Sequence, residues 1–131
     1  MTILEQVKER FSHDRFAVLT GIEITEAEVG RAVCVLPLRD DHMNSNNTPM
    51  GGAIFTLADF CFAVAANAGR DDSDTVSQHM SITYLSPGKG KQLIAQAKCI
   101  KAGRRTCLYE IMVCDELGNK VAHATGNGFT V

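Results

Sequence analysis

A single acidic side chain interrupts an otherwise apolar stretch of the sequence, GGAIFTLADFCFAVAANAG, which runs from residue 51 to residue 69. Asp59 is its only charge, and the stretch contains no proline. An ionised carboxylate in apolar surroundings costs several kcal/mol unless a partner compensates it, and such acids cluster at functional sites. A structural alternative is that Asp59 faces a solvent channel or caps a neighbouring strand. Asp59 is therefore the first candidate functional residue.

Two glycines, Gly51 and Gly52, begin the same stretch. Glycine allows a ligand to approach the backbone closely, and the first N–H groups of a helix lack intrahelical partners. Such a helix start can hold an anion or the oxyanion of a reacting carbonyl. The pair can equally serve only to shape a turn.

The spacing of these residues carries a further implication. Asp59 lies eight residues after Gly51, which is roughly 12 Å along a helix axis. One carbonyl group cannot reach both, because its carbon and oxygen would have to lie within about 3 Å of the two groups. If both act on one substrate, they must come from different subunits, so the functional reading predicts a two-fold dimer.

The elements that position these groups follow from the hydrophobic periodicity. Apolar residues at helical spacing predict a short N-terminal helix over Leu4–Phe16, and period-two alternation predicts a hairpin of strands at about 20–28 and 31–38. A polar loop follows, Arg39–Pro49, whose length favours a functional role. The 51–69 helix is apolar all round, so we expect it to be buried all round.

Alternation returns after this helix and continues to the end of the chain. Met80, Ile82 and Tyr84 alternate with His79, Ser81 and Thr83, and three further strands are separated by short glycine turns. Short turns between strands imply antiparallel pairing. The predicted fold is α+β: a curved antiparallel sheet of five to six strands wrapped around one long central helix, plus a short N-terminal helix.

Length and composition narrow the class of protein. The chain has 131 residues and a net charge of −2, which fits one domain over residues 1–131 and excludes a non-specific nucleic-acid binder. We find no apolar run long enough for a membrane span and no secretory signal at the start. Five cysteines without a C-x-x-C pair argue against zinc and structural disulfides. We therefore expect a soluble cytoplasmic domain.

The stretch from Asn44 through MGGAIFTLAD and FAVAAN to Asn67, with the later VSQHMSITYLSPG, resembles the hotdog-fold acyl-CoA thioesterases of the phenylacetate-pathway (PaaI-like) type. The resemblance covers about residues 15 to 131. It implies a hotdog sheet around the long helix, assembled as homodimers and commonly as homotetramers. It also implies hydrolysis of an aryl- or medium-chain acyl-CoA, with coenzyme A as part of the substrate and with no metal or other cofactor.

The resemblance also assigns roles to individual residues. Asp59 matches the catalytic carboxylate, acting as nucleophile or as general base for water, and Gly51 matches the glycine whose N–H polarises the thioester carbonyl. Asn44 matches an asparagine that orients the thioester or the water, and Ser77 matches a serine that positions the water or the acid. In the family, Asn44 and Gly51 would face Asp59 and Ser77 of the other subunit.

One position departs from the family pattern, because Met50 stands where a histidine usually precedes the two glycines. A thioether neither donates a strong hydrogen bond nor titrates, so the departure bears on rate or substrate range, or marks a member that only binds acyl-CoA. Phe60 and Phe62 are candidates for an acyl pocket, although core packing is the simpler role. The groups expected to contact coenzyme A are Gly52 and four cations, Lys89, Lys91, Arg104 and Arg105, although solvated charged turns would explain the cations.

Three other functions are alternatives to a thioesterase that uses Asp59. A catalytic triad could be drawn from Ser77, His79 and Asp59, but Ser77 and His79 are expected to be neighbours on one strand face, and no nucleophile elbow such as G-x-S-x-G accompanies them. A hotdog hydratase or dehydratase needs a histidine beside the acid, and His42 is the sole nearby candidate. A non-catalytic acyl-CoA sensor or carrier on the same fold is the alternative from another class.

Overall fold

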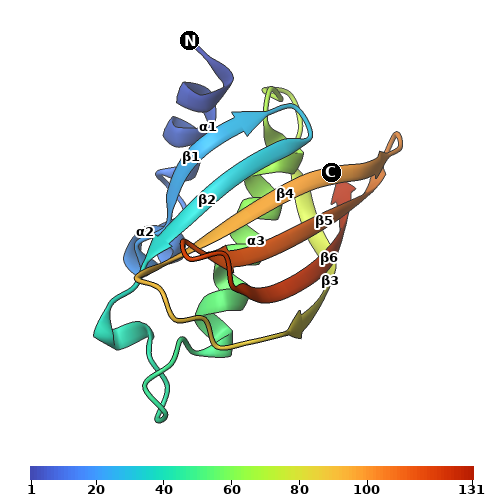
Figure 1. Cartoon of the computed structure of the whole chain (residues 1–131). Helices are drawn as coiled ribbons and strands as arrows, with labels where there is room; N and C mark the ends of the chain where they lie inside the picture. Colours follow the sequence, from blue (N-terminus) through green and yellow to red (C-terminus); the bar gives the residue numbers. More distant parts are fainter.

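An antiparallel sheet curves around one long helix in the computed structural model, which describes residues 1–131 (Figure 1). The six strands follow the order β1-β2-β4-β5-β6-β3, so β1 and β3 form the two edges. The bounds of the helices and strands are α1 Ile3–Phe11, α2 Arg15–Thr20, β1 Glu23–Glu28, β2 Arg31–Pro37, α3 Gly51–Asn67, β3 Thr75–Tyr84, β4 Gln92–Ala102, β5 Thr106–Asp115 and β6 Lys120–Thr130. The predicted architecture is confirmed, with six strands.

Helix α3 lies against the inner face of the sheet and supplies much of the core (Figure 1). Its residues Leu57, Cys61 and Phe62 are fully buried, and the Phe62 ring packs edge-on against Tyr109 with centroids 5.3 Å apart. Burying a side chain of this size stabilises the fold by roughly 1.5–3 kcal/mol. Phe62 is therefore a core residue, and its alternative role in an acyl pocket is wrong.

One stripe of α3 stays uncovered within a single chain, so the sheet alone does not bury the helix all round, and burial of this stripe at a subunit interface stays a prediction. Gly52 is exposed, and Phe55, Thr56, Asp59 and Ala63 are half-buried. Residues at spacings of three and four share one face of a helix, so the acid lies on the same uncovered stripe as the second glycine. Only Thr56 and Asp59 of this stripe are polar, which explains why the sequence of the helix looks apolar on every side.

The N-terminal segment forms two helices instead of the single helix predicted over Leu4–Phe16. Helix α1 ends at Ser12, and α2 begins only after Asp14 and ends at Gly21, whose φ of 95° is left-handed. The apolar positions that suggested one helix belong to α1, where Phe11 packs edge-on against Phe60 of α3 with centroids 5.5 Å apart. The hairpin prediction is confirmed within a few residues at each end of its strands.

Strand β3 pairs only with β6, and its other edge has no partner. Most of its side chains are exposed. An unpaired edge presents free N–H and C=O groups to another chain. No helix in the structure combines the length and the hydropathy needed to span a membrane.

Candidate active site

Asp59 and Ser77 meet where the middle of α3 crosses the first half of β3. The Ser77 hydroxyl donates a hydrogen bond of 2.8 Å to Oδ1 of Asp59. The carboxylate is half-buried, and Ser77 is its only hydrogen-bond donor within the chain. Its second oxygen, Oδ2, is therefore available to a water molecule or a substrate.

A β-bulge in β3 turns Ser77 towards the acid. The pairing with β6 changes register between Ser77 and His79, so Gln78 is one extra residue. A bulge of this kind re-aims side chains: odd-numbered residues face the helix before it, whereas Met80 and Ile82 pack against the core after it. Ser77 and His79 therefore do not share one face as predicted, and no hydrogen bond joins His79 to Ser77. The catalytic triad has no geometric basis.

The start of α3 presents two unpaired donors. Met50 is the N-cap residue and makes no side-chain capping bond, while its carbonyl accepts from Ala53 and Ile54. The N–H groups of Gly51 and Gly52 find no acceptor in the chain. They lie at the positive end of the helix dipole, where partial charge favours an anion or a polarised carbonyl oxygen.

Tyr84, which the sequence analysis did not single out, fixes the position of Gly51. Its hydroxyl donates to the Gly51 carbonyl at 3.0 Å, and its ring lies 3.2 Å from where a Cβ at Gly51 would stand. A larger residue at position 51 would therefore have to push the ring by a few tenths of an ångström. The alternation of β3 already placed Tyr84 on the helix side of the strand, but nothing in the sequence linked it to Gly51.

Asn44 is brought to the same place as Gly51 by a closed loop. Its Oδ1 accepts from the N–H groups of Asn46 and Thr48, and its Nδ2 donates to the Thr48 hydroxyl at 3.0 Å. One of the two Nδ2 protons remains unused. Asn44, Gly51 and Tyr84 line one cavity of about 390 Å³. The predicted site residues Asn44 and Gly51 therefore do come together.

The four predicted site residues therefore fall into two separate groups within the chain, which form two candidate half sites. The helix-start half comprises Asn44 and Gly51, and the acid half comprises Asp59 and Ser77. Helix α3 runs without interruption through Gly51 and Asp59, which separates the halves by roughly 12 Å along its axis. The predicted separation is confirmed.

Comparisons with known proteins establish the family of this chain. A profile of the thioesterase superfamily matches residues 46–122. The chain belongs to the thioesterase superfamily. Acyl-coenzyme A thioesterase PaaI of Escherichia coli K12 is 29% identical over 122 residues, which cover 92% of this chain and 86% of that protein.

Solved structures of the thioesterase superfamily confirm the hotdog fold. The structure of E. coli PaaI from the phenylacetic acid degradation operon superposes with a TM-score of 0.91 at 26% identity, covering 98% of this chain and 93% of that chain. The structure of smu.793 from Streptococcus mutans UA159, bound to acetyl CoA, gives a TM-score of 0.78 at 28% identity, covering 85% and 89%. The predictions of a PaaI-like family and of a thioester hydrolase are confirmed at the level of this superfamily.

The four candidate cations of this superfamily member form two pairs instead of one cluster. Lys89 and Lys91 precede β4, and Arg104 and Arg105 follow its far end, so the length of β4, about 33 Å, separates the pairs. Lys89 and Lys91 lie at the end of the sheet where the helix-start half is found, because Tyr84 closes β3 beside Gly51.

Two acidic side chains accept hydrogen bonds from the backbone of the loop that carries the two lysines. Asp115 accepts from the N–H groups of Lys89 and Gly90, and Glu116 accepts from those of Lys91 and Gln92. The hydrogen bonds that Asp115 accepts from the backbone of Lys89 and from the side chain of Asn119 hold the pKa of Asp115 well below its usual value of 3.8. The lysine side chains themselves make no ion pair, which leaves them free for an anionic ligand.

His42 performs a structural role and cannot serve as a catalytic base. It is buried, its Nδ1 accepts from the N–H of Arg39 at 3.0 Å, and its Nε2 lies 2.7 Å from the Thr20 carbonyl. Because the first nitrogen accepts, the second must carry the proton and donate it. Both nitrogens are thus occupied in joining the 39–50 loop to α2. This removes the sole histidine that the hydratase or dehydratase reading relied on.

Proposed function

We propose that this thioesterase-superfamily member hydrolyses the thioester of an aryl- or medium-chain acyl-CoA to the free acid and coenzyme A. The observation that carries the proposal is the pair of unpaired N–H groups at Gly51 and Gly52, combined with an Asp59 carboxylate that keeps one oxygen free. The acyl-CoA class is supported by E. coli PaaI, which is named an acyl-coenzyme A thioesterase, and by the acetyl CoA in the S. mutans structure.

The complete site requires two copies of the chain. Each half site includes a contact between α3 and β3. Gly51 contacts Tyr84 at one end of the strand, and Asp59 contacts Ser77 near the other end. Two β3 edges that pair antiparallel about a two-fold axis between Met80 and Ser81 place Ser77 of one copy opposite Tyr84 of the other. The acid half of each copy then meets the helix-start half of its partner, which makes two complete sites per dimer.

The chemistry at such a site needs only these groups. The thioester carbonyl oxygen accepts a hydrogen bond from the Gly51 N–H, which stabilises the negative charge of the tetrahedral intermediate. Acting as a base, Asp59 takes a proton from water as the water oxygen bonds to the carbonyl carbon. The carbon–sulfur bond then breaks, the thiolate of coenzyme A leaves, and it takes the proton from the Asp59 carboxyl group.

Direct attack by Asp59 is the other route, through an anhydride that water then hydrolyses. The two routes differ in the origin of the oxygen in the product. A single turnover in ¹⁸O-water labels the product acid if water attacks the substrate, whereas direct attack followed by hydrolysis at the Asp59 carboxyl carbon transfers an unlabelled oxygen from the enzyme. Ser77 serves either route by holding Oδ1 and so orienting Oδ2. Asn44 donates a hydrogen bond from its second Nδ2–H to the thioester or to the attacking water.

Both pairs of cations can contact one coenzyme A molecule only if they come from the two copies of the dimer proposed above. The 103–105 turn lies at the end of the sheet where β3 begins, because Arg105 accepts from the N–H of Thr130, which pairs with Thr75. Antiparallel pairing of the β3 edges brings that end of one copy towards the Lys89 and Lys91 end of its partner. The phosphates of coenzyme A would then lie between cations from both copies, with Gly52 at the entrance.

Asp59→Asn tests the reaction, with release of free thiol from phenylacetyl-, benzoyl-, hexanoyl- and lauroyl-CoA as the assay. We expect wild type to hydrolyse at least one of these and the variant to lose at least about 100-fold in kcat, the contribution of one positioned acid-base group. Asp72→Asn, at an exposed acid in the loop before β3, is the matched control. A wild type that binds acyl-CoA without hydrolysing it would establish the non-catalytic alternative that Met50 raises.

Mixing two inactive variants tests whether the site is shared. Asp59→Asn and Gly51→Pro subunits are co-expressed with different tags, and each alone is inactive. In a shared site, one of the two sites in every mixed dimer keeps both wild-type halves. A random one-to-one mixture therefore recovers about a quarter of wild-type activity, because half of its dimers are mixed. If each site lies within one chain, the mixture stays inactive.

A further inference from the structure

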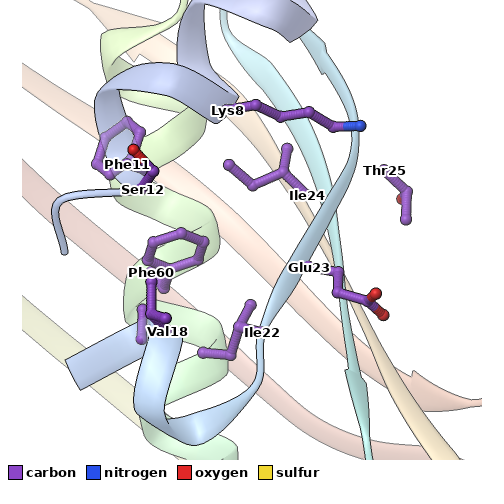
Figure 2. A pocket seen from close by; sticks show the side chains of 10 residues that line it. Lys8, Phe11, Ser12, Val18, Ile22, Glu23, Ile24, Thr25 and Phe60 are labelled. Atoms are coloured by element: carbon purple, nitrogen blue, oxygen red, sulfur yellow. The ribbon is translucent and has the colours of Figure 1, made fainter. Parts of the chain in front are cut away.

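The largest cavity of the molecule lies apart from both half sites. It has a volume of about 540 Å³ and lies between α1, α2, the start of β1 and α3 (Figure 2). None of the four predicted catalytic residues lines it. Its volume falls within the range of about 300–1,000 Å³ that is typical of small-molecule sites.

The interior of this cavity is apolar and partly aromatic. Phe11 of α1 and Phe60 of α3 meet edge to face with an interplanar angle of 81°. Val18 of α2 adjoins them, and Ile22 and Ile24 point inward from the β1 side (Figure 2). Flat rings and branched aliphatic chains together suit a phenyl ring or a short alkyl chain.

The mouth of the cavity carries one free positive charge. Lys8 extends over the opening from α1, with its amino group reaching towards β1 (Figure 2). It has no carboxylate within 4.0 Å, whereas Arg10, Arg31 and Arg39 are each paired with an acid. Glu23 also borders the cavity, but its side chain lies on the other face of β1 and points away from Phe60 (Figure 2).

We propose that this cavity binds a small organic monocarboxylate, with its apolar body between Phe11, Phe60 and Ile24 and its carboxylate on Lys8. The unpaired cation beside an apolar interior favours an anionic head over a neutral or cationic one. The acid released by the proposed hydrolysis belongs to this class of ligand. Binding at this site does not require that reaction.

Direct binding of hexanoate and phenylacetate to the whole protein tests the proposal, by calorimetry and by NMR shifts of the backbone amides. We expect saturable binding that shifts the amides of Phe11, Ile24 and Phe60 more than that of Gly51. Hexan-1-ol and 2-phenylethanol are the uncharged controls and bind more weakly. Because no thioester is present, an inactive protein that binds these acids leaves the inference intact while refuting the proposed function.

Two variants separate this cavity from other sites. Lys8→Gln weakens hexanoate binding by about threefold to fivefold, the effect of one partly exposed charge pair, whereas Lys120→Gln, at an exposed lysine on β6, leaves it unchanged. Val18→Trp fills the cavity from an exposed position and abolishes binding, and Asp59→Asn leaves it intact.

Four outcomes would overturn the proposal. They are no saturable binding at millimolar acid, equal affinity for acids and alcohols, loss of binding in Asp59→Asn but not in Val18→Trp, and a change of oligomeric state in Val18→Trp. The third would locate the acid in the active site. The last would identify the cavity as a contact between copies of the chain.

Discussion

Replacing Gly51 by proline removes the backbone N–H proposed as the oxyanion donor and should leave α3 intact. Gly51 is the first residue of α3, and its N–H has no acceptor within the chain, so proline there breaks no intrahelical bond. The preceding residue, Met50, already has φ −67° and ψ 141°, the conformation that a following proline requires. The helix should therefore form normally without this donor.

Gly51→Ala is the matched control for this substitution. Alanine and proline both introduce a Cβ, which would lie 3.2 Å from Cζ of Tyr84 and push that ring by a few tenths of an ångström. Only proline also deletes the N–H. The ratio of the two kcat values therefore isolates the donor, and an oxyanion donor is worth about 100-fold to 1,000-fold in kcat.

The assay is release of free thiol from the best acyl-CoA of the panel, at saturating and at limiting substrate. We expect Gly51→Pro to fall at least about 100-fold below Gly51→Ala in kcat, because the bond strengthens as charge develops on the oxygen. Circular dichroism and size-exclusion chromatography check the fold and the oligomeric state. Proline and alanine variants of equal kcat, both folded, would refute the assignment of Gly51 as the oxyanion donor.

Three further predictions concern Ser77, Met50 and Asp115. Ser77→Ala frees Oδ1 of Asp59 and lowers kcat by about tenfold, the value of one hydrogen bond to a charged group; an unchanged kcat would exclude a positioning role. Met50→His adds a polar, titratable side chain at an N-cap that is 57% exposed, so kcat/KM for the apolar hexanoyl-CoA should gain a pH dependence near 6.5 that wild type lacks. For Asp115, whose backbone hydrogen bonds lower its pKa from 3.8 in the folded state, stability is full above about pH 4 and is lost as the pH falls below it. Urea unfolding between pH 2 and 7 should show a shallower acid decline in Asp115→Asn.

Periodicity predicted the elements well because each buries one continuous face. The hairpin at about 20–28 and 31–38, the 51–69 helix and the later strands are all found within a few residues of their expected ends. The prediction of one N-terminal helix was wrong because its apolar positions, Leu4, Val7 and Phe11, all lie in α1, and the helix stops before Asp14 and restarts as α2. The order of the strands, with β3 beside β6, depends on contacts between distant segments that no local pattern encodes.

The candidate site was predictable only in part, and the β-bulge shows why. The residues of the acid pair were identified, but strict alternation places Ser77 on the same face as His79. One extra residue, Gln78, reverses that parity and turns Ser77 to Asp59. No glycine marks the bulge, so a period-two reading passes over it. The role of Tyr84 escaped for a related reason, because its partner is a carbonyl on a helix 33 residues away.

The proposed sharing of the site between two copies rests on how α3 and β3 cross. The helix advances about 1.5 Å per residue and the strand about 3.3 Å, yet the two touch both at Gly51 with Tyr84 and at Asp59 with Ser77. In the proposed reaction each contact carries one half of the chemistry, and the 17-residue helix keeps the two contacts apart. Bending α3 to join them would break its core packing, whereas a two-fold axis through the free edge of β3 exchanges the two ends and completes both sites at once.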